Sequence, residues 1–296
     1  MKESAIRRVG VVVKPAQPEA LGVLCELIAW LKERGLELAG EPGIDHKRVE
    51  AATGCALEIQ EPDALAESVD LLVVLGGDGT MIRAARIVGG HDVPVLGVNY
   101  GSLGYLAEFH THELFPALEA ILADDYRVDE RVMLDVEVLR DGSDEQRMSG
   151  RVLNDVVINK SALARIIEIE ARLNYQFVNS FRADGLIVST PTGSTAYNLS
   201  AGGPVIYPSM EAVVVTPICP FTLSNRPIVV PDRALIELCI KTPKEEVAIT
   251  LDGQVGFPLE VHDRVLIKKS RTTFKIVQPT NRNYFEVLRD KLCWGK

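Results

Sequence analysis

Two hydrophobic periods follow one another along the chain, and they predict two regions of different structure. Up to about residue 123, short apolar runs alternate with segments in which apolar residues recur every three or four positions. The runs indicate buried strands, and the longer period is typical of helices with one buried face. Strands that alternate with helices predict a doubly wound parallel sheet. The expected strands are residues 9–13, 36–39, 71–75 and 93–98, and the expected helices cover 24–34, 63–68, 81–88 and 112–123.

Beyond Asp129 the hydrophobic period falls to two. Strict alternation over short segments predicts antiparallel sheet, and therefore a mainly β, β-sandwich-like region. The alternating segments are residues 134–139, 167–172, 236–241 and 247–251, the last of them just before an Asp252-Gly253 turn.

The change of period sets the predicted domains. We expect an α/β domain with a Rossmann-like parallel sheet over residues 1–126 and an all-β domain over residues 127–278. Residues 279–296 form a tail in which apolar side chains return at helical spacing. We expect the tail to pack back on the first domain. The apolar positions of the tail are Phe285, Leu288 and Leu292.

Composition narrows the class of protein. The chain has 296 residues, of which 47% are hydrophobic and 25% charged, and this is typical of a globular protein with a sizeable core. A net charge of −9 argues against a nucleic-acid partner, whose binding surface would be basic. We see no signal peptide, no membrane span and no CxxC pair among the five cysteines, so we expect a reduced, cytoplasmic protein.

The strongest candidate for chemistry is the stretch LLVVLGGDGT, residues 71–80. A buried strand runs directly into a glycine turn and then into a helix. In an open α/β sheet, ligands bind beyond the carboxyl ends of the strands. Glycines let the backbone approach a phosphate, and the free N–H groups of a helix start favour an anion. A second glycine loop, residues 99–105, follows the next strand and is expected at the same sheet edge.

Asp78 is the unusual member of this turn, because a carboxylate repels phosphates unless it handles a proton or a metal. The alternative is that Asp78 caps the helix or stabilises the turn. The turn has neither the Lys-Ser/Thr ending of a P-loop nor a GxGxxG pattern, so it indicates another kind of phosphate chemistry.

Three stretches of the β domain carry more polar residues than packing needs, namely residues 153–160, 181–197 and 200–208. Small hydroxyl residues at a helix start can bind a phosphate or a ribose, and Ser194 or Thr195 would suit as an N-cap. Each stretch also has a purely structural interpretation, such as caps or satisfied backbone groups. His110 and His112 would face opposite sides of a strand, and we predict no metal site made of protein side chains.

Four motifs follow one another in a fixed order: GGDGT, GVNYGSLGYL, LNDVVI and DGLIVSTPTGSTAYNLSAGGP. In this order and at these separations they resemble bacterial NAD kinases, the ATP-NAD kinase family. The resemblance covers nearly the whole chain, including SNRPIV and the closing LRDKLCWG. GGDG alone is shared with lipid kinases of the diacylglycerol type and with phosphofructokinases, whereas TPTGSTAYxLSAGGP is far more specific.

The resemblance implies transfer of the γ-phosphoryl group of ATP to the 2′-hydroxyl of the adenosine ribose of NAD, which gives NADP and ADP. It implies Asp78 as the general base, Mg²⁺ or another divalent cation as cofactor, and a homodimer or homotetramer. Because the turn has no P-loop lysine, the cation and backbone N–H groups would meet the charge of the donor phosphates. The implied binding residues are Asp78 and Gly79 at the diphosphate turn, Asn154 and Asp155 at the nicotinamide-side ribose, Arg165, Arg182 and Asp184, the adenine segment Thr195, Ala196, Tyr197, Asn198, Leu199 and Ser200, and Gln254.

The chain departs from the family pattern at three positions. Asp155 stands where many relatives have Glu, Phe221 where His is expected, and Tyr105 where Phe is more usual. The Phe221 change puts any role of that imidazole in doubt. Arg182 is a candidate for the choice between NAD and NADH, because a cation disfavours the positively charged nicotinamide ring.

Two other functions fit part of the pattern. A kinase of the wider GGDG group would act on a lipid or a sugar, but a lipid substrate would favour a membrane-facing stretch that the sequence does not show. A non-catalytic sensor would bind NAD(H) or NADP(H) in the same pocket and would need no base at Asp78.

Overall fold

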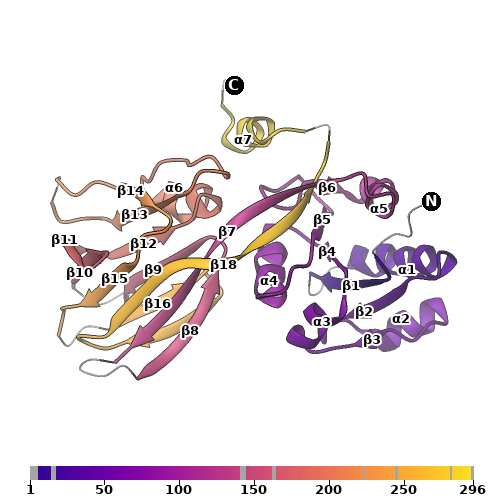
Figure 1. Ribbon diagram of the computed structural model, residues 1–296, viewed down its shortest axis with the longest axis horizontal. Coiled ribbons are helices and arrows are strands. Elements are labelled where there is room, and N and C mark those ends of the chain that lie inside the picture. The colour runs from indigo at the N-terminus through magenta and orange to yellow at the C-terminus, as the bar shows by residue number, and fades with distance from the viewer. Residues whose placement is uncertain are drawn as a thin grey trace. The chain divides into compact units, whose positions relative to one another are not determined.

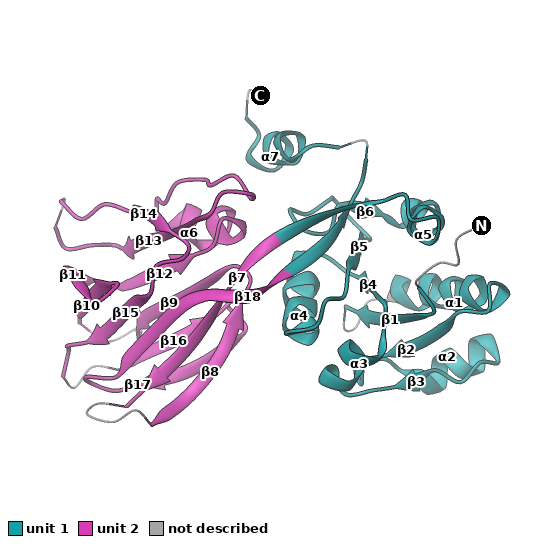
Figure 2. Cartoon of the chain, in the orientation of Figure 1, with its two compact units in different colours: residues 1–130, 274–296 teal, residues 131–273 magenta. Residues whose placement is uncertain are grey.

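The computed structural model describes residues 6–14, 18–140, 145–161, 165–222, 224–243, 246–280 and 282–294. The chain forms two compact units (Figure 2), unit 1 with residues 1–130 and 274–296, and unit 2 with residues 131–273. The domain boundaries predicted from the sequence lie at residues 126/127 and 278/279, whereas the units change at 130/131 and 273/274. The predicted boundaries stay a prediction. No helix among the described residues is long and apolar enough to cross a membrane.

Unit 1 is built on a parallel sheet whose strand order is β3-β2-β1-β4-β5. β6 and the end of β18 each pair with β5, also in parallel. Figure 1 shows this sheet with its helices alongside. Its strands are β1 (Arg8–Val13), β2 (Glu37–Gly40), β3 (Glu58–Ile59), β4 (Leu71–Leu75), β5 (Val95–Asn99) and β6 (Phe109–His110). Its helices are α1 (Pro18–Glu33), α2 (His46–Thr53), α3 (Pro62–Ser68), α4 (Asp78–Val88), η1 (Thr111–Glu113), α5 (Leu114–Leu122) and α7 (Tyr284–Leu292).

The hydrophobic pattern explains this core. All five residues of β4 are buried, because helices pack on the sheet and leave a central parallel strand no solvent face. The predicted face of α1 is buried as well, with Leu24, Leu27, Ile28 and Leu31 inside. The predicted α/β fold of this region is confirmed.

One helix of unit 1, α2, was not predicted from the sequence. Helix α2 buries only Val49, so it has no apolar period to reveal it. Its ends carry the signal instead: the Asp45 carboxylate accepts a hydrogen bond from the Arg48 N–H at 3.2 Å, and Gly54 ends the helix with φ of +67°.

Unit 2 consists of two sheets that face one core. One has the strands β11-β10-β15-β18, with β7 paired to β18 and β8 paired to β7, and the other has the order β14-β13-β12-β9-β16-β17. Side chains from both sheets form a single hydrophobic cluster, which confirms the sandwich-like prediction. The strands are β7 (Arg127–Leu139), β8 (Gln146–Val152), β9 (Asp155–Lys160), β10 (Ile167–Leu173), β11 (Gln176–Ala183), β12 (Gly185–Ser189), β13 (Ala212–Ile218), β14 (Ile228–Pro231), β15 (Ile236–Ile240), β16 (Val247–Leu251), β17 (Val255–Leu259) and β18 (Arg264–Gln278).

Two short helical segments also belong to unit 2, η2 (Thr192–Thr195) and α6 (Tyr197–Ser200). The predicted N-cap by Ser194 or Thr195 is wrong. Ser194 is buried and donates to the Pro191 carbonyl at 2.6 Å, and the Thr195 hydroxyl donates back to the Thr192 carbonyl at 3.3 Å. The chain turns twice here instead of forming one capped helix, because the hydroxyls are used inside the first turn.

The tail forms helix α7, as its apolar spacing predicts, but the buried face of this helix differs from the predicted one. Val287 and Leu288 are the buried residues of this helix, whereas Phe285 is exposed. The helix begins with a capping box, in which the Asn283 side chain accepts from the Glu286 N–H at 3.1 Å and Glu286 bonds back to the Asn283 N–H.

Candidate functional site

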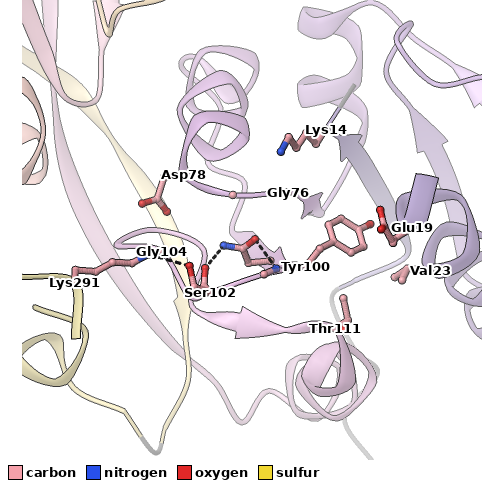
Figure 3. Close-up of a pocket in the computed structure, with 13 residues that line it drawn as sticks. Lys14, Glu19, Val23, Gly76, Asp78, Tyr100, Ser102, Gly104, Thr111 and Lys291 are labelled. Atoms are coloured by element: carbon pink, nitrogen blue, oxygen red, sulfur yellow. Dashed lines mark hydrogen bonds between the residues drawn. The ribbon is translucent and has the colours of Figure 1, made fainter. Parts of the chain in front are cut away.

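A cavity of about 640 Å³ lies in unit 1 beside the glycine turn after β4. Its wall includes the turn itself, the loop after β5, Lys14 just after β1, and side chains from α1 and α7 (Figure 3). Because β4 and β5 are parallel neighbours, both loops leave the same edge of the sheet, as predicted. The lining residues include Lys14, Glu19, Asp78, Tyr100, Ser102 and Lys291.

The glycine turn is packed closely on one side and open on the other. A Cβ atom on Gly76 would lie 2.8 Å from the Thr80 Cβ, so this position must be glycine for the turn to close. A Cβ on Gly79 would meet nothing within 4 Å, and no positive φ requires glycine there. Position 79 is therefore open on its Cβ side, in the first turn of α4.

Asp78 does not cap its helix. Gly77 is the N-cap of α4, and it makes no side-chain cap hydrogen bond. The Asp78 carboxylate instead crosses to the second glycine loop. Its Oδ2 accepts from the Tyr105 N–H at 2.9 Å, and its Oδ1 accepts from the N–H groups of Leu106 at 3.0 Å and Ala107 at 3.2 Å. Asp78 therefore joins the two loops that the sequence predicted side by side.

The loop after β5 is shaped by Asn99 and Gly104. The Asn99 side chain donates to the Ser102 carbonyl at 2.7 Å and accepts from the Gly101 N–H at 3.2 Å. A Cβ on Gly104 would overlap the Asp78 carboxylate. The loop can therefore approach Asp78 only with glycine at position 104.

Two lysines that the sequence analysis missed line this cavity, Lys14 and Lys291. Lys14 follows β1, and its backbone N–H donates to the Leu75 carbonyl at 2.9 Å, so its place at the sheet edge follows from strand order. Lys291 comes from α7, and its Nζ lies 3.4 Å from the Ser102 Oγ. Only the position of α7 on unit 1 reveals Lys291, which no local pattern could indicate.

Two tyrosines of the loop after β5 have raised pKa values. Burial, and then the Glu19 carboxylate, raise the pKa of Tyr100 far above its ordinary value. The Tyr100 hydroxyl is buried and has no hydrogen-bond partner among the described residues. Burial and the charge of Asp78 also raise the pKa of Tyr105.

A second cavity, of about 330 Å³, lies in unit 2. It brings together four of the predicted binding residues, Asn154, Asp155, Ala196 and Tyr197, and adds Asp252 to them. The Asn154 Oδ1 is buried and has no partner in the part of the chain that the structure describes. A buried acceptor without a donor is costly, so this atom is available to a ligand.

Asp252 holds the backbone of this second cavity. Its carboxylate accepts from the N–H groups of Leu153 at 2.9 Å, Asn154 at 2.7 Å and Asp155 at 3.1 Å. Asp155 is 4% exposed, and burial together with the Asp252 charge raises the pKa of Asp155 to about 7. The two carboxylates thus differ in role and in protonation. Asp252 accepts hydrogen bonds from the backbone, whereas Asp155 is partly protonated near neutral pH.

The predicted adenine segment is fixed from behind by Asn198, whose side chain is 0% exposed. Its amide donates to the carbonyls of Ser194 and Pro204, both at 3.1 Å, and its Oδ1 accepts from the Thr216 hydroxyl at 2.6 Å. Both amide protons are therefore used inside the protein. Thr195, Leu199 and Ser200 are partly or fully exposed on the same segment.

The other predicted residues lie outside the lining of the second cavity. Arg165 is exposed ahead of β10, and Gln254 is exposed in the turn between β16 and β17. The guanidinium of Arg182 lies 5.2 Å from the ring centroid of Phe221, which is 63% exposed. Asp184 pairs with Lys160 at 3.7 Å.

Among the described residues, no three His, Cys, Asp or Glu side chains gather closely enough to hold a metal ion. The prediction for His110 and His112 is wrong, since their rings stack at 5.5 Å between centroids. The strand β6 ends at His110, and the chain then turns into the 3-10 helix η1, which brings the second ring back over the first.

Comparison with known families gives two matches in succession. Residues 9–126 match the family model of the ATP-NAD kinase N-terminal domain, and residues 153–279 match that of the ATP-NAD kinase C-terminal domain. The chain is 48% identical to the NAD kinase of Geotalea daltonii over 292 residues, and 49% identical to that of Citrifermentans bemidjiense over 292 residues. Each alignment covers 98% of this chain and 100% of the relative.

Two solved structures have a similar fold. The crystal structure of an NAD kinase from Archaeoglobus fulgidus in complex with ATP superposes with a TM-score of 0.73 at 25% identity, over 97% of this chain and 98% of that chain. Yeast NADH kinase complexed with NADH gives a TM-score of 0.88 at 24% identity, over 98% of this chain and 88% of that chain. The yeast likeness shows the fold alone.

Proposed function

The chain belongs to the ATP-NAD kinase family and phosphorylates NAD with ATP, and we propose that Asp78 is the general base of this reaction. The base would take the proton from the 2′-hydroxyl of the adenosine ribose, whose oxygen then attacks the γ-phosphorus. The bond between the γ-phosphorus and the bridging oxygen breaks, and ADP leaves. The observation that carries the proposal is the Asp78 carboxylate in the wall of the unit 1 cavity, beside an open glycine turn.

The hydrogen bonds of Asp78 single out one oxygen for this role. A carboxylate offers about four lone-pair sites. Oδ1 accepts two backbone N–H groups, whereas Oδ2 accepts one, from Tyr105, among the described residues. Oδ2 therefore keeps a lone pair for the substrate proton. The same bonds hold the carboxylate in place, and a positioned base typically contributes about 10²–10⁴-fold to the rate.

The donor side needs positive charge, because phosphoryl transfer depends on positioning and charge stabilisation. Mg²⁺ commonly binds through one or two carboxylates and the substrate phosphates. The cavity fits such a cation, since Glu19 lines it together with Asp78. We propose that Glu19 and the donor phosphates hold Mg²⁺, which when bound neutralises phosphate charge. Undiminished activity in excess EDTA would contradict this dependence.

We propose that unit 2 binds the acceptor dinucleotide. Asn154 and Asp155 would hold the nicotinamide-side ribose, and the orphaned Asn154 Oδ1 supports this. Thr195, Ala196, Tyr197, Leu199 and Ser200 would lie along the adenine, with Asn198 fixing that segment from inside. Gly79 would face the phosphates. Arg165, Arg182, Asp184 and Gln254 remain binding residues in the proposal, some of them acting across a subunit contact of a cytoplasmic homodimer or homotetramer.

The reaction and its position on the ribose are tested together. Purified protein is incubated with NAD, ATP and Mg²⁺, and the product is assayed with a dehydrogenase that accepts only NADP. We expect NADP to form in step with ADP. ADP formation without a product that this dehydrogenase reduces would contradict 2′-phosphorylation.

A further inference from the structure

We propose that Lys291, near the end of the C-terminal helix α7, binds the polyphosphate chain of the donor nucleotide in the unit 1 cavity. This inference rests on the proposed function, which places the donor there. Lys291 lines the cavity together with Gly76, Gly77 and Asp78. Its Nζ lies 3.4 Å from the Ser102 Oγ, in the loop that Asp78 joins to the glycine turn. The tail of the chain thus brings a cation to a phosphate-type turn that has no lysine of its own.

The helix that carries Lys291 is fixed at its start. Its capping box satisfies the N–H groups of Asn283 and Glu286, and Val287 and Leu288 are buried. Just before the helix, the Arg282 guanidinium bonds both carboxylate oxygens of Glu113, at 2.8 and 3.0 Å. Lys291 is therefore presented by a docked element, and its own long side chain supplies the reach.

Two of the four charged side chains in the cavity wall are lysines, which suit a polyphosphate. Lys14 enters from the end of β1, so two lysines from opposite ends of the chain face one space (Figure 3). A lysine ammonium is a point charge that commonly binds phosphate. One of the two cavity carboxylates, Asp78, already accepts three backbone N–H groups, which offset its charge.

The backbone of the cavity leaves room for such a ligand. Gly101 lines the cavity from the loop after β5, and Gly79 lies in the first turn of α4, next to the lining residue Asp78. A Cβ atom on either glycine would meet nothing within 4 Å. Neither residue has a positive φ that would require glycine. Phosphate oxygens are the ligand atoms for which glycine loops leave space, because they bond directly to backbone N–H groups. Lys291 would then contact the same chain of phosphates from the side of Ser102.

The test compares two substitutions on one helix. Lys291→Gln removes the cation from the cavity, and Arg289→Gln removes a cation from an exposed position of α7 that lies roughly on the opposite side of the helix. Binding of Mg-ATP and of inorganic tripolyphosphate is measured by calorimetry at low and high salt, beside steady-state kinetics for ATP and for NAD. Lys291→Arg serves as the conservative variant.

We expect Lys291→Gln to weaken binding of ATP and of tripolyphosphate by about tenfold or more, as for loss of one charge-assisted hydrogen bond. The KM for ATP should rise with it, the KM for NAD should stay unchanged, and Lys291→Arg should recover most of the loss. A merely structural role of α7 would shift both KM values and lower the melting temperature. Equal tripolyphosphate affinity in Lys291→Gln and Arg289→Gln would overturn the inference, even where NADP formation by the wild type upholds the kinase function.

Discussion

Gly104 and Asp78 are fitted to each other: a Cβ atom on Gly104 would lie 2.8 Å from the Asp78 Oδ2 and closer still to Oδ1. Gly104 lies in the loop after β5 and Asp78 is the first residue of α4, just after the glycine turn that follows the neighbouring parallel strand β4. Three backbone N–H groups just after Gly104 donate to the same carboxylate. The proposed base is therefore held by a loop that can come this close only because residue 104 has no side chain.

Gly104→Ala should displace either the loop or the Asp78 carboxylate. We expect a loss of about 1–3 kcal/mol in the free energy of unfolding, as for overpacking, together with a strong fall in kcat. Urea unfolding and NADP formation measure the two effects. Gly22→Ala is the matched control, because a Cβ at this helical position of α1 meets nothing within 4 Å. That control should be slightly more stable and fully active. A Gly104→Ala variant as stable and as active as the control would show that the close fit is unimportant.

Asp155→Asn should change how stability depends on pH. Folding raises the pKa of Asp155 from 3.8 to about 7, so between these values the folded protein holds a proton that the unfolded chain has lost. The stabilisation of the folded state by this proton is fully present below about pH 4. It is lost as the pH rises through 7, at up to about 1.4 kcal/mol of unfolding free energy per pH unit. The asparagine variant lacks this loss.

Urea unfolding at pH 5 and pH 8 tests the sign. The wild type should lose more stability than Asp155→Asn between the two values, because the charged Asp155 faces Asp252 in a buried place. Equal losses in the two proteins would mean that Asp155 is ionised without penalty.

Arg182→Ala should raise the turnover of NAD relative to NADH, because a cation near the nicotinamide disfavours the positively charged ring of NAD. Phe221→Leu is the control, since it removes the ring 5.2 Å from the guanidinium carbon and leaves the charge in place. The ratio of kcat/KM for the two substrates is the measurement. An unchanged ratio in Arg182→Ala would remove this residue from the choice between them.

The sequence predicted the strands, helices and turns whose burial pattern can be read from residues adjacent in the chain. The apolar run of β4 and the glycines after it predicted a ligand-binding sheet edge, and the cavity lies there. The alternation at residues 247–251 predicted β16 and the turn at Asp252. The short helix α2 was missed because it buries one residue.

The partners of the site residues could not be predicted, because they come from distant segments. No pattern near Asp78 shows that Tyr105, Leu106 and Ala107 bond to it. Nor does any pattern show that Asp252 holds the backbone at Asn154. Lys291 reaches the cavity only because α7 docks on unit 1, which depends on tertiary packing and not on the helical spacing of its own residues.

Asp78 either acts as the base of the reaction or only anchors the loop after β5. Asp78→Asn keeps the size of the side chain, but it replaces one of the two carboxylate oxygens by an NH₂ group. This donor then faces a backbone N–H group. The most direct measurement is kcat for NADP formation by this variant, with its dissociation constants for NAD and Mg-ATP determined in parallel. We predict a fall in kcat of about 10²–10⁴-fold, nearly unchanged dissociation constants, and residual activity that rises with hydroxide concentration. Wild-type kcat in a folded Asp78→Asn protein would contradict the role as the base, and a loss of activity explained by equally weakened binding would assign Asp78 to the loop alone.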